Sequence, residues 1–255
     1  MCNPLGAQTN AIVQWSAIER CRSDYPIDRV HLEAQDVLRL FGQFNPRSAD
    51  DREEKIQLFL HQKFPALLGG TSPLSSPNRS AEFRLGFDVA ASGQGDLAAF
   101  YIDAPEASQL SLRALITART EDWHFLKTVL FYLLRRLPRL RAAGDESGLG
   151  RQICWEAASQ FSSRFLKVNL ASKKHDLGFA LMNQLSTAEK RFPRSEQDIA
   201  ADFFALRKSY TGTKWIFTEG RNTFNPASHC DIAWAAALAS HTHANQKEEP
   251  WAYVC

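Results

Sequence analysis

The chain has 255 residues, of which 44% are hydrophobic and 23% are charged. This is the composition of a folded globular protein with room for one large domain, or one domain with an appendage. Thirty Lys and Arg residues against 28 Asp and Glu residues give a net charge of +2. Global charge therefore gives no argument for nucleic-acid binding, which would need a local basic surface. The best apolar run, residues 129–134, ends at Arg135 and is too short to span a bilayer, so we expect no membrane segment.

The five cysteines are scattered along the chain without any Cys-x-x-Cys pair, and no secretory leader precedes them: Cys2, Cys21, Cys154, Cys230 and Cys255. This pattern is typical of reduced thiols in a cytoplasmic protein. Cys154 and Cys230 lack the ligand spacing of a zinc site, so we expect them to be buried thiols.

Residues 1–68 are predicted to form a helical appendage. Helical spacing of apolar residues covers residues 12–21, 30–41 and 50–64, with Pro26 and Pro46 as breaks. Residues 69–80 are rich in Gly, Ser and Pro and are predicted to be a linker, which puts the domain boundary there.

The stretch of residues 82–103 predicts a pair of antiparallel strands joined by a glycine-bearing turn. Alternation puts Phe83, Leu85, Phe87 and Val89 on one side of the first strand, so Asp88 projects from the other side of an otherwise apolar run. A lone aspartate in such a place is most simply a strand-end residue that bonds to the loop. Metal-dependent nucleases also begin their active sites in this way.

The rest of the chain alternates between predicted strands and helices. Strands are expected at residues 110–118, 139–144, 165–170 and 215–218, and helices at residues 121–137, 151–161, 177–192, 199–208 and 228–240. Three strands followed by alternating strands and helices predict an α/β domain over residues 81–243, a mixed sheet flanked by helices, with a polar tail at residues 244–255.

Two further aspartates have both a structural and a functional interpretation. Asp145 follows a strand at a turn where Gly148 permits a close bend, and turn chemistry alone would explain it. Residues 228–231 fit a capping box that would explain Asp231. The functional interpretation brings both together with Asp88 as hard oxygen ligands for Mg²⁺ or Mn²⁺, two of which, about 4 Å apart, assist phosphodiester cleavage. Because clustered carboxylates repel one another, such a site predicts metal dependence.

Three sequence blocks in this order resemble the C-terminal nuclease domain of tailed-phage large terminase subunits, those of Mu-like phages in particular. The blocks are Gly-Phe-Asp-Val-Ala-Ala-Ser-Gly-Gln-Gly-Asp, Gly-Asp-Glu-Ser-Gly-Leu-Gly and Ser-His-Cys-Asp-Ile-Ala-Trp-Ala-Ala-Ala-Leu-Ala. The resemblance covers about residues 83–240. It implies a ribonuclease H-like fold and metal-dependent cutting of double-stranded DNA during genome packaging in the cytoplasm of a bacterial host, with the portal, the small terminase subunit and the prohead as partners.

The resemblance also implies which residues act. Asp88, Asp145 and Asp231 are the expected catalytic and metal-binding acids, with Mg²⁺ or Mn²⁺, two ions in the expected arrangement, as cofactor. Weaker candidate ligands are Asp96, Glu146 and His229. DNA-binding candidates are Lys173 and Lys174, which a solvated turn would equally explain, and Arg139 and Arg141, which the dipole of the preceding helix would favour without DNA.

The chain departs from the large terminases in one respect. Their N-terminal ATPase needs Gly-x-x-x-x-Gly-Lys-Ser/Thr, and this sequence contains no Gly-Lys pair. We expect no ATP binding or hydrolysis, and we interpret residues 1–68 as a remnant of that ATPase or of a connector. Two other functions stay open: a junction resolvase-like nuclease of the same fold, and a non-catalytic assembly component or prophage remnant.

Overall fold

We analysed a computed structural model that describes residues 10–71, 81–89, 97–148, 150–225 and 228–244. None of the helices in these ranges is long and apolar enough to cross a membrane.

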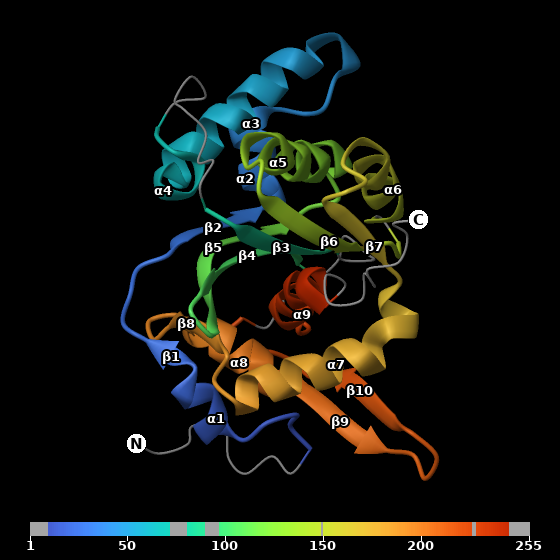
Figure 1. Ribbon diagram of the computed structural model, residues 1–255. Helices are drawn as coiled ribbons and strands as arrows, with labels where there is room; N and C mark the ends of the chain where they lie inside the picture. Colours follow the sequence, from blue (N-terminus) through green and yellow to red (C-terminus); the bar gives the residue numbers. More distant parts are fainter. Residues whose placement is uncertain (1–9, 72–80, 90–96, 149, 226–227, 245–255) are drawn as a thin grey trace, which may run out of the picture.

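A mixed sheet runs through the middle of the molecule (Figure 1). Within the described residues it has eight strands in the order β1-β8-β5-β4-β3-β6-β7, and β2 also pairs with β5. These strands are β1 (Arg22–Ser23), β2 (Asp28–Glu33), β3 (Phe83–Asp88), β4 (Ala98–Glu106), β5 (Gln109–Arg119), β6 (Leu140–Asp145), β7 (Phe165–Val168) and β8 (Lys190–Pro193). The pairs β3–β4 and β4–β5 are antiparallel, whereas β3–β6 and β6–β7 are parallel. A separate antiparallel hairpin is formed by β9 (Leu206–Tyr210) and β10 (Trp215–Glu219).

Helices cover both faces of this sheet (Figure 1). One face carries α2 (Ala34–Phe41), α3 (Ala49–Lys63), α4 (Pro65–Leu68), α5 (Trp123–Arg136) and α6 (Gly150–Gln160). The other face carries α9 (Asp231–Ala244) directly against the strands, with α7 (Leu170–Ser186), α8 (Gln197–Ala205) and α1 (Trp15–Arg20) beyond it. A 3₁₀ turn at Pro46–Ser48 precedes α3.

The central strand β3 separates two apolar cores. Leu85, Phe87 and Val89 pack into the core beneath α5, as the predicted alternation requires. Gly86 and Asp88 face the opposite core, which contains α9. A Cβ atom at Gly86 would lie 1.7 Å from the carbonyl oxygen of Ala235, so α9 contacts the strand backbone directly and only glycine fits there.

The mixed sheet flanked by helices is confirmed, but the all-helical appendage predicted for residues 1–68 is wrong. Residues 28–33 form β2, which pairs with β5, and residues 22–23 pair with β8. Val30 and Leu32 are buried while His31 between them is exposed, which is the period of a half-buried strand. The predicted helix over residues 30–41 therefore begins only at Ala34.

Two later helices end earlier than predicted. Residues 190–193 are strand β8, so the helix predicted to residue 192 ends at Ser186. That helix also starts seven residues earlier than expected, because Asn169 caps it by accepting a hydrogen bond from the backbone N–H of Ser172 at 3.1 Å. Residues 206–208 belong to β9 and not to the helix before it.

Several predictions fall outside the described residues. These include most of the linker over residues 69–80, the turn with Asp96, and the tail from residue 245. The thiols of Cys21, Cys154 and Cys230 are free and buried, as expected, while Cys2 and Cys255 lie outside the described residues.

Candidate acidic site at the end of the central strands

Asp88 and Asp145 lie side by side at the carboxyl ends of two parallel strands. In the β3–β6 ladder Phe87 pairs with Gly144, and the same register carried one residue further brings the two aspartates opposite each other. Neighbouring strands are about 4.8 Å apart. Both aspartates face the α9 side of the sheet, because Gly86 and Ala143, two residues earlier, contact or line that core.

Asp231 is brought to the same place by the direction of α9. Ala235 sits on Gly86, and Thr242, near the far end of α9, lines a pocket with Arg84. The helix therefore runs antiparallel to β3. One turn before Ala235, about 5.4 Å along the axis, its first residue Asp231 reaches the level of Asp88.

Asp88 shows the electrostatic effect of this arrangement. The residue is 7% exposed, and burial is the largest influence that raises the pKa of its carboxyl group well above the ordinary value. The negative charges of Asp231 and Asp145 raise the pKa further, in that order. No described residue donates a hydrogen bond to its carboxylate. A buried acid between two other acids, without a donor, is an expensive arrangement in the absence of a cation.

The carboxylates of Asp145 and Asp231, in contrast, accept hydrogen bonds from N–H and O–H donors. Oδ1 of Asp145 accepts from the backbone N–H groups of Leu170 at 3.1 Å and Ser147 at 3.3 Å, and the Ser147 hydroxyl donates to Oδ2. Oδ2 of Asp231 accepts from the backbone N–H groups of His229 at 3.0 Å and Leu97 at 3.3 Å. As they stand, no three His, Cys, Asp or Glu side chains among the described residues are arranged to hold a metal ion.

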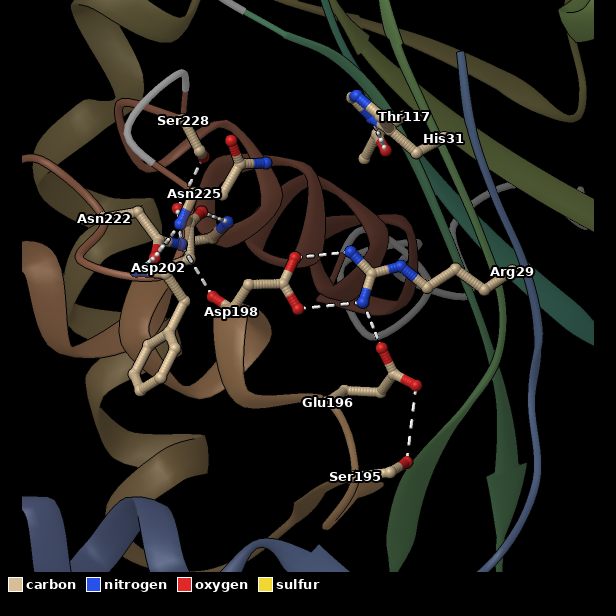
Figure 2. A network of polar contacts seen from close by, with 12 residues as sticks. Arg29, His31, Thr117, Ser195, Glu196, Asp198, Asp202, Asn222, Asn225 and Ser228 are labelled. Atoms are coloured by element: carbon tan, nitrogen blue, oxygen red, sulfur yellow. Dashed lines mark hydrogen bonds and ion pairs between the residues drawn. The ribbon is translucent and has the colours of Figure 1, made fainter.

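At the start of α9 the Ser228 hydroxyl belongs to a buried network and not to a capping box, which was one of the two explanations for Asp231 (Figure 2). The Ser228 hydroxyl donates to Asp202 on α8 at 2.5 Å, and the other carboxylate oxygen of Asp202 accepts from the backbone N–H of Ala233 at 3.0 Å. Asn222 donates to the same carboxylate at 3.0 Å. Asp202 thus caps the helix from α8, while the Asp231 carboxylate accepts from the backbone N–H groups of His229, before the helix, and of Leu97, before β4.

A glutamate that sequence reasoning missed also acts on Asp88. Glu219 ends β10, and its charge follows those of Asp231 and Asp145 in raising the pKa of Asp88. Oε1 of Glu219 accepts from the indole N–H of Trp234 at 2.9 Å and forms an ion pair with Lys174. The predicted strand over residues 215–218 stopped one residue short of it, and nothing in the sequence linked the hairpin to the acids.

Lys174 is the predicted DNA-binding residue that lies nearest the acids. It is on α7, where its ammonium group lies 5.2 Å from the Trp234 ring and lowers the pKa of Asp88 against the effect of the acids. Lys173 is exposed and pairs with Asp176 at 3.5 Å, so the structure does not bring it to the site.

The other candidate metal-binding and DNA-binding residues lie in different places relative to the three aspartates. Glu146 follows Asp145 and approaches the Lys167 ammonium at 4.0 Å. His229 contributes its backbone N–H to Asp231. Arg139 and Arg141 lie before and within the first half of β6, at the opposite end from Asp145. Asp96 lies outside the described residues.

No protein-family model and no curated protein matches this sequence. Solved structures do match its fold. The large terminase nuclease from thermophilic phage G20c with bound magnesium superposes with a TM-score of 0.52 at 16% identity, over 65% of this chain and 84% of that chain. The same nuclease with bound cobalt gives a TM-score of 0.50 at 18% identity, over 64% and 81% of the two chains.

This chain has the fold of a large terminase nuclease. The ribonuclease H-like sheet flanked by helices that the three sequence blocks implied is thereby confirmed. At 16 and 18% identity the likeness establishes the fold. In this terminase nuclease fold the three aspartates come from β3, β6 and the first residue of α9.

Proposed function

We propose that the protein is a divalent-metal-dependent nuclease that cuts double-stranded DNA during phage genome packaging. The observation that carries the proposal is the buried carboxylate of Asp88, which lies between Asp145 and Asp231 and receives no hydrogen bond from the described residues. The terminase nuclease of phage G20c, which shares the fold, has been solved with bound magnesium and with bound cobalt.

The residues fit such an ion by their chemistry. Carboxylate oxygens are the ligands that Mg²⁺ and Mn²⁺ prefer, and a cation would offset the mutual repulsion of the three acids. Asp88 is available as it stands. Asp145 and Asp231 would have to turn from their N–H and hydroxyl donors toward Asp88, which accounts for the absence of a complete ligand set among the described side chains.

Bound Mg²⁺ or Mn²⁺ would supply activation of water and stabilisation of the leaving oxygen. The chain itself supplies three things. The sheet and α9 exclude water from Asp88. The N–H groups of Leu170 and Leu97 hold the carboxylates of Asp145 and Asp231 near Asp88 before an ion binds, and Lys174 offers a positive charge beside them. Because the site would act on the phosphodiester backbone and would not contact base edges, we expect cleavage to depend little on the DNA sequence.

The biological setting is part of the same proposal. We propose action in the cytoplasm of a bacterial host, with the portal, the small terminase subunit and the prohead as partners. ATP hydrolysis is not expected from this chain.

The test is plasmid cleavage with Mg²⁺ or Mn²⁺ by the protein and by Asp88→Asn, Asp145→Asn and Asp231→Asn. Each variant should lose cleavage at least a hundredfold while keeping its circular dichroism spectrum. Asp50→Asn, on the exposed side of α3, is the matched control and should cut normally. Full cleavage activity in one of these variants would show that the substituted aspartate is not part of the catalytic site.

Two other outcomes would redirect the proposal. Strong preference for four-way junctions over linear duplex would indicate a junction resolvase. Absence of cleavage together with absence of Mn²⁺ binding in calorimetry would indicate a non-catalytic packaging component.

A further inference from the structure

The hairpin of β9 and β10 carries two exposed aromatic rings near its turn. Tyr210 and Trp215 are cross-strand partners, and their ring centres lie 5.3 Å apart. Tyr210 is 58% exposed and Trp215 is 41% exposed. A single exposed aromatic residue is ordinary, but two neighbouring rings form a larger apolar surface of the kind that ligands cover. We call this pair of rings the aromatic platform.

The other end of the hairpin is fixed to the body of the protein. Phe217 is buried, and its ring packs edge-on against Phe179 of α7, with 5.2 Å between the ring centres. Glu219 accepts a hydrogen bond from the indole N–H of Trp234 on α9. Figure 1 shows the turn of the hairpin at the edge of the molecule, beyond α7. The aromatic platform is therefore held in place from its base, which limits the entropy lost when a ligand binds.

The hairpin is also basic. Residues 206–221 contain a single carboxylate, that of Glu219, which already pairs with Lys174. They contain four positively charged side chains, none of which forms an ion pair with a described carboxylate: Arg207, Lys208, Lys214 and Arg221. The ammonium group of Lys208 lies 5.7 Å from the centre of the Trp215 ring. The charge of this surface therefore favours an anionic ligand.

We propose that the outer end of the β9–β10 hairpin binds unpaired nucleotides. An unpaired base offers a flat face that can stack on an aromatic ring, and its phosphate can contact the neighbouring lysines and arginines. Stacking needs no base edge, so we expect no selection of base sequence. Bases inside a duplex are stacked on one another, and their faces are closed to the aromatic platform. The hairpin should therefore prefer a single strand to a duplex.

This binding surface is separate from the acidic site. The four steps along β10 from Trp215 to Glu219 span about 13 Å, and Glu219 contacts Trp234, one turn after Asp231 on α9. The aromatic platform thus lies at the far end of the hairpin from the acids. The inference goes beyond the proposed nuclease function and does not depend on it.

The test measures fluorescence anisotropy in EDTA, where cleavage plays no part. The ligands are a labelled single strand of about 12 thymidines and a labelled duplex of about 20 base pairs. The double variant Tyr210→Ala/Trp215→Ala should bind the single strand about tenfold more weakly and the duplex with unchanged affinity. Trp155→Ala is the matched control. Trp155 is 54% exposed, but the Lys167 ammonium covers one face of its ring at 3.3 Å, so both affinities should stay unchanged.

A second variant tests the phosphate contacts. Lys208→Gln/Lys214→Gln should weaken binding of the single strand and make its affinity fall less steeply as the salt concentration rises. An unchanged salt dependence would overturn these contacts. Unchanged single-strand affinity in the aromatic double variant would overturn the proposal, and it is the result expected if the rings bind a protein. Equal weakening for single strand and duplex would overturn it as well, because the rings would then not require unpaired bases.

Tryptophan fluorescence keeps the test valid if the aromatic double variant is poorly folded. The single strand should quench part of the emission of the unmodified protein, and Trp215→Phe, which keeps a ring at this position, should lose that quenching while it still binds. Equal quenching in both proteins would show that no base stacks on Trp215. Because no metal is present, failure of the proposed cleavage would leave these results unaffected.

Discussion

Oδ2 of Asp202, on α8, accepts a hydrogen bond from the backbone N–H of Ala233, in the first turn of α9, at 3.0 Å. One helix therefore caps the next, and the helix that it caps carries Asp231. Arg29 on β2 pairs with Asp198, one turn before Asp202 on the same helix (Figure 2). Through these contacts α8 links the edge of the sheet to the start of α9.

We expect Asp202→Ala to lower the free energy of unfolding by about 3 kcal/mol, because it leaves the buried donors of Ser228, Asn222 and Ala233 without their acceptor. Ser228→Ala, which removes one donor and keeps the acceptor, should cost about 1 kcal/mol. Urea denaturation measures both. Equal losses in the two variants would contradict the capping role of the carboxylate.

Gly86→Ala should separate α9 from β3. Its new methyl group would meet the backbone of Ala235 and Ala239, which no side-chain rotation can relieve. We expect a loss of about 1–3 kcal/mol in urea denaturation and a large loss of cleavage, because Asp231 moves with the helix. Ser209→Ala, on the hairpin, is the control and should change neither. An unimpaired Gly86→Ala protein would show that α9 does not lie against this strand.

The ion pair between Lys190 and Asp103, 2.6 Å apart and fully buried, offers a double-mutant cycle. Lys190→Met alone leaves a carboxylate in the core and should cost about 3–5 kcal/mol. Lys190→Met/Asp103→Leu removes both charges and should recover most of that loss. Additive losses in the two single variants and the double variant would mean that the pair contributes no coupling.

Lys174→Met should destabilise the metal-free protein by about 1 kcal/mol, since it removes a positive charge that faces Glu219 and Asp88. The matched control is Lys173→Met, one residue earlier and exposed. Thermal melting in EDTA and in Mn²⁺ distinguishes them. The loss of stability should be smaller in Mn²⁺ if the bound cation offsets the negative charges that Lys174 offsets in the metal-free protein. A loss of the same size in EDTA and in Mn²⁺ would argue against a cation near Lys174.

The stability of the metal-free protein should depend on pH through Asp88. Burial and the neighbouring acids raise its pKa in the folded state above the unfolded value of about 3.9, so the folded protein binds the proton more tightly. The contribution of Asp88 is therefore present at low pH, and the free energy of unfolding falls as the pH rises through the raised pKa. Urea denaturation in EDTA at several pH values should show a flatter profile for Asp88→Asn than for the unmodified protein.

The strands that carry the acids could be predicted from sequence because their signals are local. Alternation around Asp88 gave the correct face, and Gly148 placed a turn after Asp145. The burial of β2 at Val30 and Leu32 was equally local, but a short strand joined directly to a helix was interpreted as helix throughout.

The rest of the candidate site depends on contacts between distant parts of the chain. Asp202 caps α9 from another helix, and Glu219 reaches Asp88 only because Trp234 and Lys174 hold it there. Neither residue lies in a motif. Arg139 and Arg141 are separated from the acids because they lie at the start of β6 and Asp145 lies at its end. The clustering of basic residues in the sequence does not show this separation.

The position of α9 also constrains when this protein can work. The helix lies in the centre of the molecule against β3, although it is the last helix that the structure describes along the chain. On a ribosome, the strands with Asp88 and Asp145 are made well over eighty residues before Asp231 leaves the exit tunnel. The nascent polypeptide thus lacks its third acid, and cannot complete the acidic site, until α9 has been synthesised and has packed against β3.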